Sequence, residues 1–309
     1  MLDVFPRVVA HADWSMHPGK RWLARAILQP SGSYRALAPE PVGALEDLFA
    51  RLAGGGSGDG AVLLGVDFPI GLPKAYAKSA RIDDFVEHLA QFDDRFYAVA
   101  RQPSEICITR PFYPYSAGKK GMVSRQQLLE GLALVGTGGL HRRCEQLANA
   151  SPLFWTLGAK QVGRAAISGW RDLLAPALRD GLDLAIWPFQ GPLPELVAEH
   201  CYVVAETYPA EIYRHLKLPP ISKRRQASRR NTAPTLLAFT NHAQIEVDPP
   251  LGAEICDGFG GTADGEDRFD ATVGLFGMLN VVLGGRAPGE PDDPSITRIE
   301  GWILGQSVF

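Results

Sequence analysis

The sequence has few cysteines and no long apolar run. Its four cysteines form no CxxC pair, which argues against a zinc ribbon or a disulfide framework and predicts reduced thiols in a cytoplasmic protein. The longest uncharged apolar run, residues 271–285, is interrupted by Gly274, Gly277 and Asn280. It is shorter than the ~20 residues that a membrane-spanning helix needs. The first residues also lack the basic start and apolar centre of a signal peptide, so we expect neither secretion nor membrane insertion.

A charge excess of one sign is absent as well. The 31 Lys and Arg residues nearly balance the 34 Asp and Glu residues, which leaves a net charge of -3. A protein that coats DNA generally is therefore disfavoured, and a polyanionic partner would have to bind a local basic patch. With 46% hydrophobic residues among 309, the chain is long and apolar enough to form a sizeable globular core of one or two domains.

The first quarter of the chain alternates strand and helix signals. Three short apolar runs separated by turn residues, at 7–12, 22–28 and 34–37, predict an antiparallel meander. An amphipathic helix is predicted over 45–52, and the near-continuous apolar run 61–66 predicts a buried strand. Because a helix joins the meander to this fourth strand, we expect it to lie parallel to the first.

The middle of the sequence is predicted to be mainly helical, and strand signals return after it. Short apolar runs at 184–187 and 202–205 predict two further strands, a long helix is expected from about Glu266, and a short terminal strand is expected at 298–304. The sequence thus predicts a discontinuous α/β core, residues 1–75 and 182–309, interrupted by a helical insertion, residues 76–181.

Three carboxylates stand at the ends of predicted strands: Asp13, Asp67 and Glu206. Loops open into a ligand crevice at such strand ends, and acids held there suit catalysis or metal binding. Polar residues also end strands simply for solvation, but three together favour a site.

Two further acids, Asp267 and Asp270, lie three residues apart on one face of the last predicted helix. Carboxylates that converge from strands and a helix would repel one another unless cations lay between them. Oxygen-rich clusters of this kind are typical sites for Mg²⁺ or Mn²⁺ and for two-metal phosphoryl chemistry.

Several motifs resemble those of one known family. The segments concerned are HADWS at 11–15, VDFPIGLP at 66–73, FWTLGAKQVGRAAISGW at 154–170, AETYPAEIYRHL at 205–216, DRFDA at 267–271 and EGWIL at 300–304. In these segments the sequence resembles the domain of unknown function 429 family, a group of predicted ribonuclease-H-like nucleases.

This resemblance implies a ribonuclease-H-like mixed sheet flanked by helices. It places the first acid of that superfamily at Asp13, the second at Asp67, and the helix acid at Asp270 together with Asp267. We therefore expect Asp13, Asp67 and Asp270 to hold Mg²⁺ or Mn²⁺, with Asp267 and Glu206 completing or orienting the catalytic shell.

A basic stretch follows the strand that ends at Glu206. It is the best candidate for phosphate contacts in the sequence, although a solvated surface loop is an equal alternative. Its predicted substrate-binding residues are Lys223, Arg224, Arg225, Arg229 and Arg230.

The sequence thus predicts a metal-dependent nuclease that hydrolyses nucleic acid with two metal ions. One alternative is an ATP-dependent kinase or ATPase of the actin and sugar-kinase type, for which the glycine-rich segment 258–262 is the supporting feature. A second alternative is a binding scaffold without catalysis. Whether the substrate is DNA or RNA, and whether the protein forms a homodimer, stay open.

Overall fold

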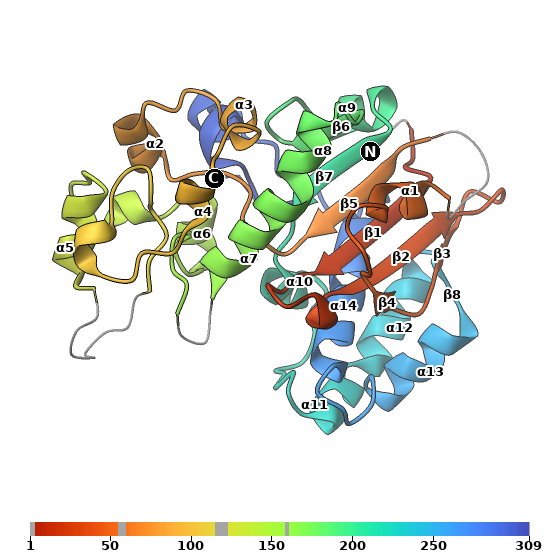
Figure 1. Cartoon of the computed structure of the whole chain (residues 1–309). Helices are drawn as coiled ribbons and strands as arrows, with labels where there is room; N and C mark the ends of the chain where they lie inside the picture. The colour runs from red at the N-terminus through yellow and green to blue at the C-terminus, as the bar shows by residue number, and fades with distance from the viewer. Residues whose placement is uncertain (1–3, 55–59, 115–122, 158–160, 309) are drawn as a thin grey trace.

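The computed structural model describes residues 4–54, 60–114, 123–157 and 161–308. Within these residues eight strands form one mixed sheet with helices on both faces (Figure 1), which confirms the predicted α/β class. The strands are β1 (Val8–Asp13), β2 (Trp22–Leu28), β3 (Tyr34–Ala36), β4 (Glu40–Pro41), β5 (Val62–Val66), β6 (Leu184–Trp187), β7 (Tyr202–Glu206) and β8 (Glu246–Val247).

The strand order places β1 near the centre of the sheet. The order is β6-β7-β5-β1-β2-β3-β8, with β4 paired to β2. Strands β1, β2 and β3 form the predicted antiparallel meander. Strand β5 is parallel to β1, also as predicted, and β7 and β6 continue the parallel half of the sheet. Three neighbouring parallel strands, β1, β5 and β7, therefore end at one edge.

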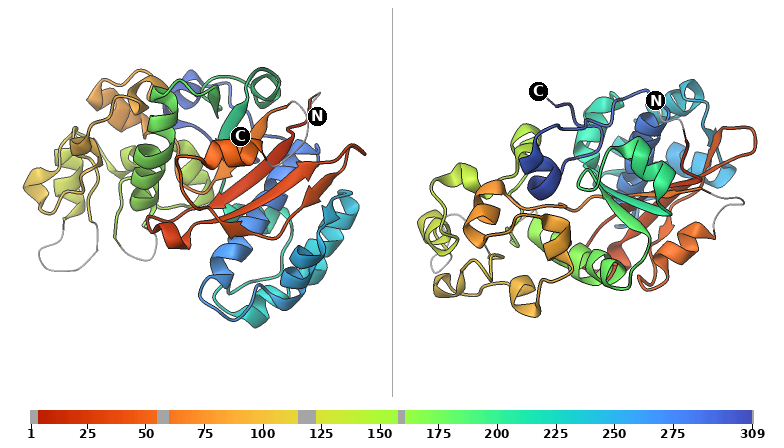
Figure 2. Two further views of the ribbon diagram at one scale, coloured as in Figure 1. Left: turned by 45° about the vertical axis from the view of Figure 1, so that its right-hand side comes forward. Right: turned by 90° about the horizontal axis from the view of Figure 1, so that it is seen from above.

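The helices on the first face come from the chain between β4 and β6. Helix α1 (Leu48–Ala53) lies against the sheet, and the remaining helices gather mostly at one side of it (Figures 1 and 2). They are α2 (Lys74–Ala80), α3 (Phe85–Leu89), α4 (Asp94–Tyr97), α5 (Arg125–Gly131), α6 (Arg143–Ala148), α7 (Val162–Gly169) and α8 (Ala175–Arg179). The described residues of the predicted insertion 76–181 contain helices and isolated bridges but no extended strand.

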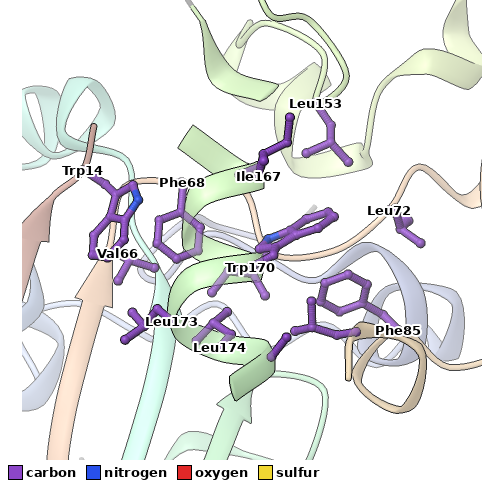
Figure 3. Close-up of a cluster of buried hydrophobic side chains, with 14 of the residues drawn as sticks. Trp14, Val66, Phe68, Leu72, Phe85, Leu153, Ile167, Trp170, Leu173 and Leu174 are labelled. Atoms are coloured by element: carbon purple, nitrogen blue, oxygen red, sulfur yellow. The ribbon is translucent and has the colours of Figure 1, made fainter. Parts of the chain in front are cut away.

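One hydrophobic cluster joins this helical part to the sheet. Trp14 and Phe68 follow β1 and β5, and their ring centroids lie 5.2 Å apart (Figure 3). Phe68 also packs on the backbone of α7, because a Cβ atom at Gly169 would lie 2.4 Å from the tip of its ring. Trp170 continues the cluster to Phe85, 5.1 Å away between centroids. The helices of the insertion thus share a core with the sheet.

The second face is covered by helices that follow β6 in the chain: α9 (Leu193–Glu199), α10 (Pro209–His215), α11 (Gln226–Arg230), α12 (Ala233–His242), α13 (Pro249–Asp257) and α14 (Gly265–Val282). Helix α14 crosses β1 at Gly274, where an added Cβ would lie 2.2 Å from the ring of His11. His11 is buried and hydrogen-bonded to the Thr207 hydroxyl at 2.8 Å. A glycine therefore lets the helix lie close enough to bring its first turns to the end of β1.

Three features differ from the expectations. Strands β4 and β8 have only two residues each, too few for an apolar pattern to reveal. The terminal strand predicted at 298–304 is wrong: a helical turn, Ile296–Glu300, occupies its first part, and Ile303 forms only an isolated bridge to Glu206.

In the part of the chain that the structure describes, no helix has the length and apolarity to cross a membrane.

Candidate functional site

The sheet brings the three predicted strand-end acids to one edge. Asp13 is the last residue of β1, Asp67 directly follows β5, and Glu206 is the last residue of β7. In the parallel register Val66 pairs with both Ala12 and Glu206. The acids therefore stand at nearly the same height on three adjacent strands.

Asp13 and Asp67 form a carboxyl pair. Asp67 Oδ1 accepts a hydrogen bond from the backbone N–H of Trp14 at 2.6 Å, and the Asp67 carboxyl is also hydrogen-bonded to that of Asp13. Burial, followed by repulsion from Asp67, raises the pKa of Asp13 well above its usual range. Burial likewise raises the pKa of Asp67 to about 7. Both shifts go in the same direction and disfavour ionisation of both carboxyls together, as expected for two acids buried side by side.

Helix α14 adds the other two predicted acids. Asp270 is buried, accepts a hydrogen bond from the Tyr213 hydroxyl, and pairs with the Lys223 ammonium at 2.5 Å. Burial raises the pKa of Asp270, and Lys223 partly opposes this increase. Asp267 is partly exposed, and burial followed by repulsion from Asp270 and Glu266 raises its pKa to about 6. Both acids also repel Asp13, so the helix and the strand ends form one electrostatic cluster.

The donor set of this cluster fits a hard divalent cation in part. Asp13 and Asp67 offer carboxylate oxygens alone, the ligands that Mg²⁺ and Mn²⁺ prefer. A cation between them would relieve the repulsion that, together with burial, raises the pKa of Asp13. Within the described ranges, however, no three His, Cys, Asp or Glu side chains are arranged to hold a metal as they stand. Asp270 is turned instead to Tyr213 and Lys223.

Glu206 lies at the same edge but belongs to a different network. Its carboxylate accepts two hydrogen bonds of 2.7 Å from the Arg142 guanidinium and one of 2.6 Å from the Ile70 backbone N–H. Arg142 is fully buried, pairs also with Glu145 at 3.0 Å, and donates to the Glu300 carbonyl. The structure thus places Glu206 in an ion network that holds the insertion to the sheet. Nothing in the local sequence around Arg142 indicated this role.

The predicted substrate residue Arg229 is buried. Its guanidinium donates to the backbone carbonyls of Gly258, Gly260 and Lys223. With the side chain withdrawn from solvent, Arg229 holds two loops together instead of facing a phosphate. The charge pattern of the sequence did not reveal this, because the accepting Gly258 and Gly260 lie 29 and 31 residues further along the chain, beyond two helices.

The other four basic residues differ in surroundings. Lys223 lies in the acid cluster, 3.1 Å from Glu266 as well as close to Asp270. Arg230 pairs with Asp257 at 3.1 Å on the surface. Arg224 and Arg225 are exposed, with 84% of the Arg224 side chain accessible. These two retain the most freedom to contact a ligand.

A cavity of about 780 Å³ opens beside the acid cluster. Asp67, Glu206 and Asp270 line it, whereas Asp13 and Asp267 do not. Its other lining residues include cations from three separate segments that the sequence analysis did not connect, which are Lys20, Arg164 and Arg224. The sequence predicted Arg224 as a substrate-binding residue, but only the fold adds Lys20 and Arg164 to it, because each of the three comes from a different loop or helix. The cavity can therefore take an anionic ligand next to the carboxyl pair.

Comparisons with known proteins do not identify this site. No protein-family model matches the chain. Searches of curated proteins and of solved structures likewise find no match.

Proposed function

We propose that the chain is a divalent-metal-dependent phosphodiesterase that acts on nucleic acid. The observation that carries this proposal is the Asp13–Asp67 carboxyl pair at the ends of adjacent parallel strands, with Asp270 close enough to repel both acids and a cavity beside them. The order of the meander, crossover helix and parallel strand supports a ribonuclease-H-like fold. The resemblance to the domain of unknown function 429 family points to the same activity.

Each acid has a distinct task in this proposal. Asp13 and Asp67 hold the ion, and the Trp14 N–H fixes the orientation of the Asp67 carboxylate. A bound Mg²⁺ or Mn²⁺ supplies Lewis-acid stabilisation of charge on the phosphate. In the proposal, Asp267, half-buried with a pKa of about 6 and close enough to Asp13 to repel it, accepts the proton of the attacking water. Hydrolysis forms a P–O bond to that water and breaks the P–O bond to the leaving sugar oxygen, which takes up a proton.

The cationic residues of the cavity support a nucleic-acid substrate. Lys20, Arg164 and Arg224 line the same cavity as Asp67. Phosphates of a polynucleotide would bind such dispersed cations, because each positive side chain neutralises one backbone charge. Arg225, next to Arg224 and exposed, extends this surface.

The kinase alternative has less support from the geometry. A phosphate-binding loop must offer its backbone N–H groups to the ligand. In the segment 258–262, the carbonyls of Gly258 and Gly260 accept from Arg229, and the N–H of Gly260 donates to Asp257 at 3.1 Å. The segment therefore serves as a packed turn.

The test is metal-dependent cleavage of labelled single-stranded DNA, duplex DNA, RNA and a four-way junction. We expect cleavage of at least one substrate with Mn²⁺ or Mg²⁺ and none with EDTA. Asp13→Asn should reduce the rate more than about a hundredfold, beyond the usual loss for a residue that merely orients a metal ligand. Asp180→Asn, an exposed acid at the end of α8, is the matched control. Cleavage that is unaffected by Asp13→Asn would refute the proposed metal site. Inactivity on every substrate would favour the alternative of a binding scaffold without catalysis.

A further inference from the structure

Lys223 places a positive charge inside the acid cluster. Its ammonium lies 2.5 Å from Asp270 Oδ2 and 3.1 Å from Glu266 Oε1. The Tyr213 hydroxyl donates to the other oxygen of Asp270. Both oxygens of the helix acid are therefore bound by groups of the chain itself.

The position of this lysine is fixed from the protein interior. The buried Arg229 donates to the Lys223 backbone carbonyl and also to the carbonyls of Gly258 and Gly260. The backbone N–H of Ser222 donates to the Ser228 hydroxyl at 2.9 Å. The loop that carries Lys223 is thus anchored on both sides of the residue, unlike a free surface lysine.

The electrostatic influence of the ammonium extends over the whole cluster. Lys223 lowers the pKa of Asp13, Asp67, Asp267 and Asp270, opposing their burial and mutual repulsion. Burial alone would lower the pKa of Lys223, but Asp270 and Glu266 raise it above its ordinary value. The ammonium therefore stays charged and neutralises the helix side of the cluster.

We propose that Lys223 fills the second cation position of this site, so that the protein binds one divalent ion, at Asp13 and Asp67, beside one resident ammonium. This inference rests on the proposed function and replaces the two-metal arrangement expected from the sequence. It also accounts for the incomplete three-carboxylate ligand set, because Asp270 pairs with Lys223 instead of joining Asp13 and Asp67.

The same ammonium can bind the substrate. An ammonium group has three N–H donors, and in the described part of the chain two of them point to Asp270 and Glu266. Lys223 also lines the cavity, so the third donor is available to a phosphate oxygen there. Lysine binds phosphate as a point charge, which is the task that the second ion would otherwise perform.

The experiment counts bound Mn²⁺ per chain, by following the free-ion signal in electron paramagnetic resonance during a titration of the full-length protein. We expect one ion for the wild type and two for Lys223→Met, which keeps the length of the side chain but removes its charge. Lys223→Arg restores a positive charge and should return the count to one. Lys78→Met, the same change on the exposed face of α2, should leave it at one.

The possible results separate this inference from the proposed function. Two ions bound by the wild type, or one ion bound by a folded Lys223→Met, would overturn the role of Lys223 while leaving the metal site intact. No ion bound by either protein would overturn the metal site itself. The wild-type count does not depend on the folding of any variant.

Discussion

Replacing Asp67 with Asn removes one ionisable group from the carboxyl pair while keeping an oxygen that can accept the Trp14 N–H. In the native protein the pKa of Asp67 is about 7, mainly because of burial, whereas an unfolded aspartate titrates near 3.9. Between these values the native state binds a proton that the unfolded state does not. The free energy of unfolding therefore falls as the pH rises from about 4 to about 7.

The magnitude follows from the size of this shift. Each pH unit between the two pKa values costs ~1.4 kcal/mol, so Asp67 alone should remove up to about 3 kcal/mol of wild-type stability between pH 5 and pH 8. Asp67 borders the cavity, and water there reduces this value. Asp67→Asn should lack the contribution of Asp67 while the raised pKa values of Asp13 and Asp267 still act, so its stability should fall less steeply with pH than that of the wild type.

The assay is urea unfolding of both proteins in metal-free buffer at pH 5, 6, 7 and 8. Asp180→Asn is the control, because Asp180 is exposed and outside the cluster. Parallel pH dependences of wild type and Asp67→Asn would refute the argument, since they would mean that Asp67 titrates alike in the folded and unfolded states.

Two further predictions concern packing and the buried ion network. Arg142→Met should cost about 3–5 kcal/mol of unfolding free energy in a urea titration, because it leaves the carboxylate of Glu206 buried without a cation. Adding Glu206→Gln to this variant should recover part of the loss. The control is Arg171→Met, which breaks an exposed ion pair and should cost under about 1 kcal/mol. Gly274→Ala should cost about 1–3 kcal/mol of unfolding free energy in the same titration by overpacking, because the new methyl group would push α14 away from His11. Gly138→Ala, where no atom lies within 4 Å of the added carbon, should not. Equal losses in a variant and its control would contradict the prediction concerned.

The sequence predicted the strand-end acids well because the information is local. An apolar run that fills a central strand must end where the sheet ends, and the next polar residue then lies at the edge. Asp13, Asp67 and Glu206 satisfy this condition, and the helix between the meander and β5 sets the parallel register that brings the first two together.

The partners of these acids could not be predicted in the same way. Arg142 and Glu206 are 64 residues apart in the chain, and only the packing of the insertion on the sheet brings them into contact. Arg229 and Lys223 read as two cations of one basic run, yet the first is buried against carbonyls and the second lies among carboxylates. Composition gives the number of charges in a segment but not the direction in which each one points.

The network around Arg142 also limits how the chain could be shortened. A shorter protein made by deleting residues 76–181 would lose the guanidinium that neutralises Glu206 and bridges the carbonyls of Ile70 and Glu300. The remaining sheet would then carry the Glu206 carboxylate without its guanidinium partner. Removing the insertion would therefore require replacing Glu206 with an uncharged residue. It would also require covering the ring of Phe68, which is buried against Gly169 and would be exposed by the deletion.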